Sequence, residues 1–253
     1  MAFQRSSVKL EGKIGDLSFY KVDDNFLVKQ KGGNSKKRIA NDPIFERTRE
    51  NAMEFGNASS FTKQLKLSLK LSLGCSFELF SDPSLTNRLN KRINSILKAD
   101  SVNTRGNRQL LNDNLFLLTG FSLNNVAALK DTFFIPLVSE WLKSEKLIRL
   151  KLPRFLPKSV TDAPEKASLF QFHVCATMKV NENLQSISMH SELFALDTVQ
   201  EAQDLDLLLG EVNADVAILF FGISFFSEVA GYAVPLTAPC KNALDVISVS
   251  VKS

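Results

Sequence analysis

The amino-acid sequence predicts an α+β fold with three parts: an N-terminal β-hairpin arm, a helical segment and a C-terminal antiparallel β-sandwich. Three observations carry this prediction. A turn-forming cluster separates two apolar runs near the N-terminus, Asp-Pro pairs at 42–43 and 82–83 are typical helix starts, and short apolar segments recur densely after residue 109. We place the arm and a basic loop at 1–41, the helical segment at 42–100 and the sandwich at 101–253.

The arm is predicted from residues 8–31. Leu17, Phe19 and Tyr20 precede the turn cluster Asp23-Asp24-Asn25, and the apolar run Phe26-Leu27-Val28 follows it. Glycines at 12 and 15 indicate a bulge or a close backbone approach in the first strand. The next segment, KGGNSKKR over 31–38, is expected to be a mobile, positively charged loop.

The helical segment begins at Asp42-Pro43, where Asp can accept the first free N–H groups and Pro suits the first helical position. We expect this helix to end near Phe55, with Gly56 as a break. Leucines then alternate with Lys or Ser over 65–73, which is the periodicity of a strand. Helix is favoured because Leu, Lys and Gln propagate helices well, although strand remains the alternative.

A further helix is expected after Asp82-Pro83, ending near Asp100. Its apolar residues recur at spacings of three and four, which places them on one helix face. They are Leu85, Leu89, Ile93, Ile96 and Leu97.

The sandwich is predicted from short segments that are rich in Val, Ile, Leu and Phe and separated by Asn, Asp, Pro and Gly. One short helix, about 136–144 around Leu137 and Trp141, is expected among them. The predicted strands are 115–122, 146–152, 168–180, 185–196, 205–212, 215–229 and 243–252.

The charges of the chain are polarised along the sequence. Residues 1–110 hold 20 basic and 11 acidic residues, whereas 111–253 hold 11 and 16. Solvated faces are the default interpretation of such a pattern, pairing with copies of the same chain comes next, and contact with a nucleic acid comes third. The basic residues expected to form one interacting face are Lys29, Lys31, Lys36, Lys37 and Arg38. The acidic residues expected on the partner face are Asp197, Glu201, Asp204, Asp206, Glu211 and Asp215.

Candidate chemistry is sparse. The sequence contains no GxSxG, HExxH, Walker-type or GxGxxG motif, and the pair Gly32-Gly33 lacks the spacing of a phosphate-binding loop. His173 and Cys175 share one strand face, but a zinc site needs three or four ligands. Carboxylates over 197–215 lack the Gly-centred turn of a calcium loop. We therefore predict no catalytic residue, metal or cofactor, and reduced thiols at Cys75, Cys175 and Cys240.

Three segments together resemble a family of uncharacterised proteins from Bacteroidetes-type bacteria. These segments are KLEGKIGDLSFYK, KGGNSKKRIANDPIFERTRENAMEFG and GISFFSEVAGYAVPLTAPCKNALDVISVSV. The resemblance implies a helix after Gly56 and a bacterial, non-secreted, non-enzymatic protein. Some members are similar in style to phage-like structural proteins, an analogy that carries no catalytic residue to this chain.

The leading functional hypothesis is a structural or assembly protein, a homo-oligomer that self-associates through its hairpin arm and its oppositely charged faces. Nucleic-acid binding through the basic N-terminal half is the alternative. A sugar- or peptide-binding sandwich would need a concave, aromatic-lined pocket. The N-terminus lacks a secretory h-region and Val216–Phe226 is too short to cross a bilayer, so we expect a cytoplasmic protein or one released within an assembly.

Overall fold

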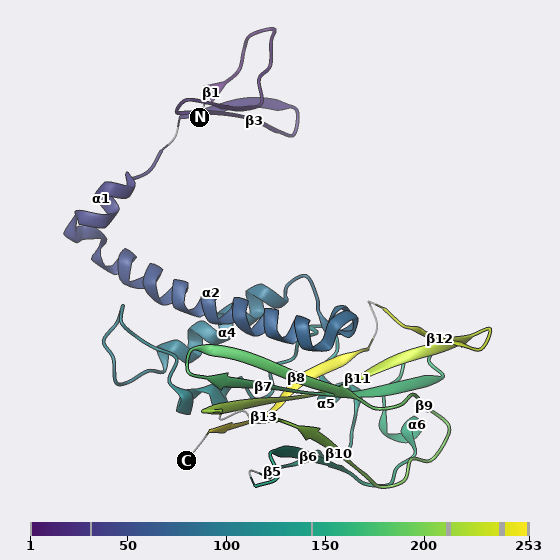
Figure 1. Cartoon of the computed structure of the whole chain (residues 1–253). Helices are drawn as coiled ribbons and strands as arrows, with labels where there is room; N and C mark the ends of the chain where they lie inside the picture. The colour runs from purple at the N-terminus through teal and green to yellow at the C-terminus, as the bar shows by residue number, and fades with distance from the viewer. Residues whose placement is uncertain (1, 31, 143, 211–213, 238–240, 252–253) are drawn as a thin grey trace. The chain divides into compact units, whose positions relative to one another are not determined.

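The computed structural model describes residues 2–30, 32–142, 144–210, 214–237 and 241–251. The chain divides into two compact units, residues 1–51 and 52–253. Figure 1 shows helices together with antiparallel strands, so the predicted α+β class is confirmed. No helix in the described ranges combines the length and the apolar character needed to cross a membrane.

The first unit contains a four-stranded antiparallel sheet with the strand order β1-β4-β3-β2. The predicted hairpin is confirmed as β3 and β4, joined by a turn in which Asp23 has a φ of 52°. The strands are β1 (Ala2–Phe3), β2 (Gly12–Ile14), β3 (Leu17–Val22) and β4 (Asn25–Gln30). Two short strands that the sequence did not predict therefore widen the arm into a sheet.

The predicted basic loop is wrong for its last three residues, which begin helix α1 (Lys36–Asn41). The Ser35 hydroxyl caps this helix by accepting the Arg38 N–H at 3.2 Å. A short 3₁₀ helix, η1 (Pro43–Phe45), follows, and the Asp42 carboxylate accepts the Ile44 N–H at 3.1 Å. The helix start predicted at Asp42-Pro43 is confirmed.

Helix α2 (Glu46–Leu73) runs without interruption, so the predicted break at Gly56 is wrong. A single glycine costs a helix only about 1 kcal/mol, and the buried residues on both sides of Gly56 offset that cost. The favoured helix over 65–73 is confirmed. Leu65, Leu69 and Leu73 are buried, whereas Leu67 and Leu71 face solvent. The alternating pattern thus arises from two leucine rows on opposite sides of one helix.

Hydroxyl groups join α2 to the edge strand β8 (Asn183–His190). The Ser186 hydroxyl donates to the Ser68 hydroxyl at 2.8 Å, and the Ser188 hydroxyl donates to the Ser72 carbonyl at 2.7 Å. The Ser186 hydroxyl also lies 2.7 Å from the Thr177 hydroxyl of the neighbouring strand. Small polar side chains therefore let the helix approach the sheet closely at this contact.

The second unit contains further helical elements after α2. The helix predicted after Asp82-Pro83 is confirmed, and its five apolar residues are all buried. The strand predicted at 115–122 is wrong, because Leu115 and Leu118 are buried three residues apart, as 3₁₀ geometry requires. The elements are η2 (Gly74–Ser76), α3 (Phe77–Phe80), α4 (Leu85–Lys98), η3 (Asn112–Leu118), α5 (Leu129–Thr132) and α6 (Pro157–Val160).

The strands of the second unit form two antiparallel sheets. The larger sheet contains β8 with β7 (Leu169–Val180), β9 (Phe194–Ala195), β11 (Val216–Val229), β12 (Tyr232–Pro235) and β13 (Ala243–Val251). The smaller sheet has the order β10-β6-β5, with β5 (Val138–Leu142), β6 (Leu147–Leu152) and β10 (Gln203–Leu208). The helix predicted at 136–144 is wrong, because Val138 and Trp141 favour a pleated strand and pair with β6.

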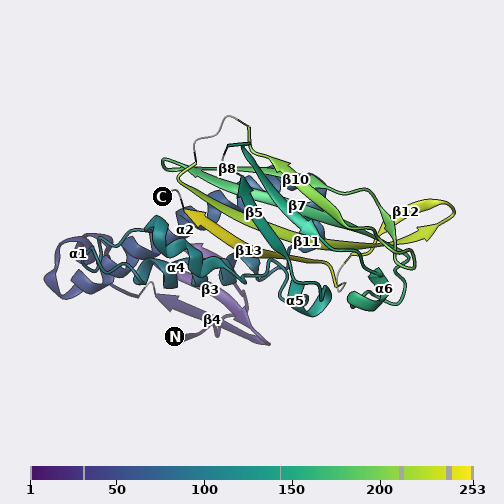
Figure 2. The same ribbon diagram turned by 90° about the horizontal axis from the view of Figure 1, so that it is seen from below.

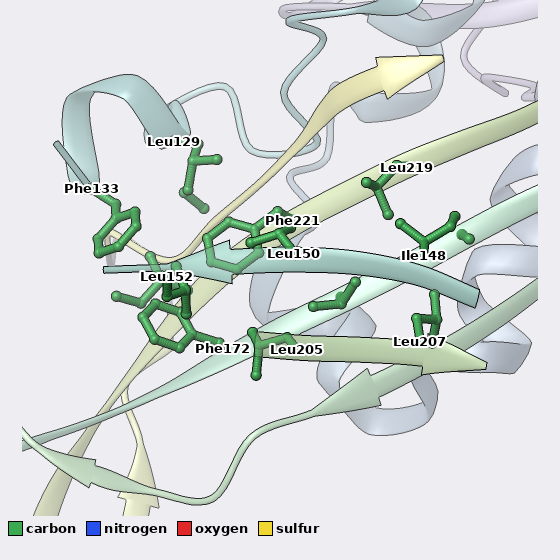
Figure 3. Close-up of a cluster of buried hydrophobic side chains, with 14 of the residues drawn as sticks. Leu129, Phe133, Ile148, Leu150, Leu152, Phe172, Leu205, Leu207, Leu219 and Phe221 are labelled. Carbon is green, nitrogen blue, oxygen red and sulfur yellow. The ribbon is translucent and has the colours of Figure 1, made fainter. Parts of the chain in front are cut away.

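The central strand β11 contributes to two hydrophobic clusters, one on each face of the larger sheet. Leu219, Phe221 and Ile223 belong to the cluster shared with the smaller sheet. Figure 3 shows Leu219 and Phe221 in this cluster together with Leu150 and Leu205. Ile218 and Phe220 pack toward the helices. Figures 1 and 2 show β5 and β10 lying across β7 and β11, with α2 and α4 on the opposite face of the larger sheet. Helices from 52–98 and strands from 169–251 therefore share one of the two cores.

Candidate functional site

The four-stranded sheet of the first unit has no hydrophobic core. Among residues 2–30 and 32–51, no residue is buried. The strand register places Ile14 opposite Leu17, Phe19 opposite Val28 and Lys21 opposite Phe26. Because directly opposed residues lie on the same face of a sheet, the apolar members form one continuous surface, which we call the arm face. The arm face consists of Ile14, Leu17, Phe19, Phe26 and Val28.

Two lysines border the arm face. The Lys9 and Lys21 ammonium groups lie 5.9 and 5.5 Å from the centroid of the Phe26 ring, within cation–π distance. Lys21 also lies 3.8 Å from the Asp24 carboxylate at the turn. The border of this apolar surface therefore carries positive charge.

The five predicted basic residues do not form one cluster of free cations. Lys29 is exposed on β4 and lies opposite Ser18, which places it on the other face of the sheet, and Lys31 lies outside the described residues. Lys36 and Lys37 are exposed on α1 and form no ion pair with any described residue.

Arg38 is already engaged within the first unit. Its guanidinium pairs with Asp42 at 3.2 Å and donates to the Asn34 side chain at 3.0 Å. It also lies 5.7 Å from the Phe45 ring centroid. Arg38 would have to give up these contacts to bind an anionic partner.

The predicted acidic residues on β10 are paired with a cation on the adjacent strand. The register sets Asp206 opposite Arg149, and the guanidinium donates to both carboxylate oxygens at 2.8 and 2.7 Å. Asp204 lies 3.5 Å from the same group. The hydrogen bonds from Arg149 hold the pKa of Asp206 below its ordinary value, while those to Asp206 raise the pKa of Arg149. Both strand carboxylates thus bind Arg149, an arrangement unlike a calcium loop.

The remaining predicted acidic residues are dispersed. Glu201 pairs with Arg154 at 3.2 Å, and the Asp215 carboxylate accepts the Asn181 N–H at 3.3 Å. Asp197 is exposed, and Glu211 lies outside the described residues. Two arginines from other parts of the chain, Arg149 and Arg154, therefore pair with three of the six carboxylates counted along 197–215.

His173 and Cys175 lie together in the core of the second unit. His173 Nε2 is 2.8 Å from the Ser224 hydroxyl, and burial lowers the pKa of His173 to about 3. Burial raises the pKa of the Cys175 thiol to about 12. No set of three or more His, Cys, Asp or Glu side chains among the described residues is arranged to hold a metal ion. Both side chains are uncharged at neutral pH, and both are buried where β7 packs in the core.

One polar pocket lies within the second unit, between α2, the segment before η3 and the β7–β8 turn. Its volume is about 430 Å³, and Phe61 supplies the single aromatic side chain. The Lys179 ammonium at its wall donates to the Asn112 side chain at 2.9 Å. The lining residues are Asn57, Ser60, Phe61, Gln64, Gln109, Leu110, Lys179, Glu182 and Leu184. These groups offer hydrogen bonds but include no nucleophile with an adjacent base.

Sequence reasoning missed one exposed apolar surface, at the β11–β12 hairpin. Val229, Tyr232 and Val234 are exposed there, and the turn uses positive φ at Ala230 (52°) and Gly231 (80°). The sequence marks this turn by the pair Ala-Gly between Val229 and Tyr232. That pair is a weaker hairpin signal than the usual Asn-Gly or Asp-Gly.

Searches against protein-family models, curated proteins and solved structures find no match to this chain.

Proposed function

We propose that this protein is a non-enzymatic structural subunit that self-associates through its N-terminal arm. The observation that supports this proposal is the arm sheet itself, in which four strands form without a buried residue while five apolar side chains share one face. Ile14 and Leu17 are 60% and 40% exposed. Another protein surface is the natural cover for such a face.

A small sheet gains little stability unless one of its faces is covered. A two-stranded hairpin is marginally stable in water, and three or more strands with a hydrophobic face, or packing against a helix, are needed for independent stability. Burying a Leu, Ile, Val or Phe side chain contributes about 1.5–3 kcal/mol, so covering the half-exposed arm face would contribute on the order of 5 kcal/mol. Association costs at least about 4 kcal/mol in lost freedom of motion, so the apolar area that the partner buries must add to this gain.

Charge has a secondary role in this proposal. Asp204 and Asp206 are already paired with Arg149, and Glu201 with Arg154, so these carboxylates have little left to offer a basic partner. Apolar contact is weakened little by salt, whereas contact between exposed charges is screened. The proposed association should therefore persist at high ionic strength.

Light scattering coupled to size-exclusion chromatography tests the proposal over a range of protein concentrations at low and high salt. The wild-type chain should show a mass above that of one 28.2 kDa chain, at both ionic strengths. The double variant Ile14→Ser/Leu17→Ser should elute as a monomer. Val22→Ser, an exposed change on the other face of the same sheet, is the matched control and should still associate. A monomeric wild-type chain at every concentration would refute the proposal.

Nucleic-acid binding is the second candidate function, favoured by Lys36 and Lys37, which are exposed and form no ion pair with any described residue. Filter binding at low salt would detect it. Binding that weakens steeply with salt and is lost in Lys36→Ala/Lys37→Ala would support this function. Absence of retention at low salt would eliminate it.

A further inference from the structure

The β11–β12 hairpin extends the larger sheet as a ribbon of two strands. Val216–Ile223 of β11 pairs with β13, and β7 pairs with β11 as far as Phe226. Beyond that residue only β12 accompanies β11. β12 is an edge strand with no second neighbour among the described strands. Figure 1 shows it at the end of the sheet where β9 and α6 also lie.

The hairpin presents its apolar residues on one face. Val229 lies opposite Tyr232, and Val234 lies opposite Ser227, two residues before Val229. Their exposed fractions are 56% for Val229, 76% for Tyr232 and 44% for Val234. We call these three side chains the hairpin tip. Tyrosine is enriched among the residues that dominate binding energy in protein interfaces, and the two valines add apolar area beside it.

The segments beside the base of the hairpin carry more exposed carboxylates than exposed ammonium groups. Ser168, in the loop before β7, joins this loop and the residue after β9 to the base of the hairpin. Its N–H donates to the Phe226 carbonyl, its carbonyl accepts the Leu196 N–H and its hydroxyl accepts the Glu228 N–H. Asp162, which is exposed in the loop before β7, pairs with Lys241. Further exposed charged residues near the base of the hairpin are Glu165, Glu192, Asp197 and Glu228, against Lys158 and Lys166, and Glu228 lies on the face of the hairpin opposite the tip. None of these six forms an ion pair within the described chain.

The first unit has the opposite sign. Residues 1–51 contain eleven Lys and Arg against seven Asp and Glu, a net charge of +4. Lys9 and Lys21 stand at the border of the arm face itself. The chain therefore carries two exposed apolar surfaces: two lysines lie at the arm face, and carboxylates outnumber lysines beside the base of the hairpin that carries the tip.

We infer that the arm face of one copy binds the hairpin tip of a second copy. This inference rests on the proposed function and names the partner surface. Tyr232 would pack against Phe19 and Phe26, while the bordering charges orient the contact. Because the two surfaces differ, the contact is heterologous, and each added copy leaves one arm face and one hairpin tip free. Such a contact builds open chains or closed rings.

Complementation between two variants tests the inference. The arm variant Ile14→Ser/Leu17→Ser keeps an intact hairpin tip, and the hairpin variant Tyr232→Ser/Val234→Ser keeps an intact arm face. Each variant alone should be a monomer in light scattering. An equimolar mixture should form a dimer that grows no further, since one arm face meets one hairpin tip and the other two surfaces are blocked.

Alternative results separate this inference from the proposed function. If the hairpin variant assembles like the wild type, the arm pairs with another surface: the inference fails and the proposed function stands. If the mixture stays monomeric, the inference also fails. A monomeric wild type defeats both. Leu208→Ser, an exposed change on β10, is the matched control and should assemble like the wild type. If this control were a monomer, the loss of assembly in the hairpin variant would not be specific to the hairpin tip, and the inference would fail.

Hydrogen–deuterium exchange of the wild-type chain provides a measurement that does not depend on how the variants fold. Backbone amides of residues 12–30 and 226–236 should become protected on going from dilute to concentrated protein, while those of β10 should not change. Protection of the arm without protection of the hairpin would overturn the inference.

Discussion

Gly222 lies in the middle of β11, where the backbone of β13 approaches it closely. A Cβ atom at this position would lie 2.3 Å from the Ala243 carbonyl oxygen and 2.8 Å from Leu244 Cδ1. Neither neighbour can withdraw easily, because Ala243 and Leu244 are fully buried and paired with β11. Gly222→Ala therefore requires the two strands to separate.

The cost of this separation follows from the geometry. Ordinary Cβ contacts begin near 3.4 Å, so the carbonyl oxygen must move by about 1 Å. Overpacking a core costs about 1–3 kcal/mol, and each ladder hydrogen bond that is lost adds about 1 kcal/mol. We expect Gly222→Ala to lower the free energy of unfolding by about 3–5 kcal/mol.

Urea unfolding followed by the fluorescence of Trp141, the one tryptophan of the chain, measures this change in the second unit. Gly56→Ala is the matched control, since its added Cβ meets nothing within 4 Å in the helix α2. That change should raise the free energy of unfolding by about 0.5–1 kcal/mol. A Gly222→Ala protein within 1 kcal/mol of the wild type would refute the reasoning.

Three further predictions concern buried polar groups. The pKa of His173 is about 3 in the folded chain and about 6.5 when unfolded, so between these values the unfolded state binds more protons. His173 should therefore make stability fall by up to about 1.4 kcal/mol per pH unit as pH drops below 6.5, and urea titrations of His173→Gln should lack this slope. Burial raises the pKa of Asp245, whose Oδ1 has no hydrogen-bond partner among the described residues, so stability should fall as pH rises above 3.8. Asp245→Asn should remove that fall and raise the melting temperature at neutral pH, with a gain of about 1 kcal/mol; an unchanged pH profile would contradict it. The buried Glu54 carboxylate accepts the Gly106 N–H at 2.9 Å, so Glu54→Ala should cost about 2–3 kcal/mol and speed amide exchange over 100–109; slow exchange there would show that the loop is held by other contacts.

Sequence reasoning succeeds where burial follows a simple period. The apolar residues of α4 recur on one helical face, and the long runs in β7 and β11 lie in a sheet covered on both faces, so each pattern matches its element. It fails where two patterns compete. Leu115 and Leu118 fit a strand run as well as a 3₁₀ turn, and the spacing of Leu137 and Trp141 fits a helix although β6 offers a pairing edge.

The functional surfaces were harder to predict, because sequence order does not show which charges meet in space. Asp204 and Asp206 look like a free acidic stretch along the chain, but both pair with Arg149, which lies opposite Asp206 and is more than fifty residues away in the sequence. The arm was predicted as a hairpin, yet its lack of a core depends on side-chain exposure that no period reveals.

The hydroxyl contacts between α2 and β8 also settle a choice that the leucines leave open. A helix with leucines on opposite sides could present either row to the sheet by turning about its own axis. Directional bonds from Ser186 and Ser188 are satisfied in one rotational setting only, the one that places Ser68 and Ser72 against β8. These small hydroxyls thus select which leucines the protein keeps inside, and they leave Leu67 and Leu71 as an outward apolar strip.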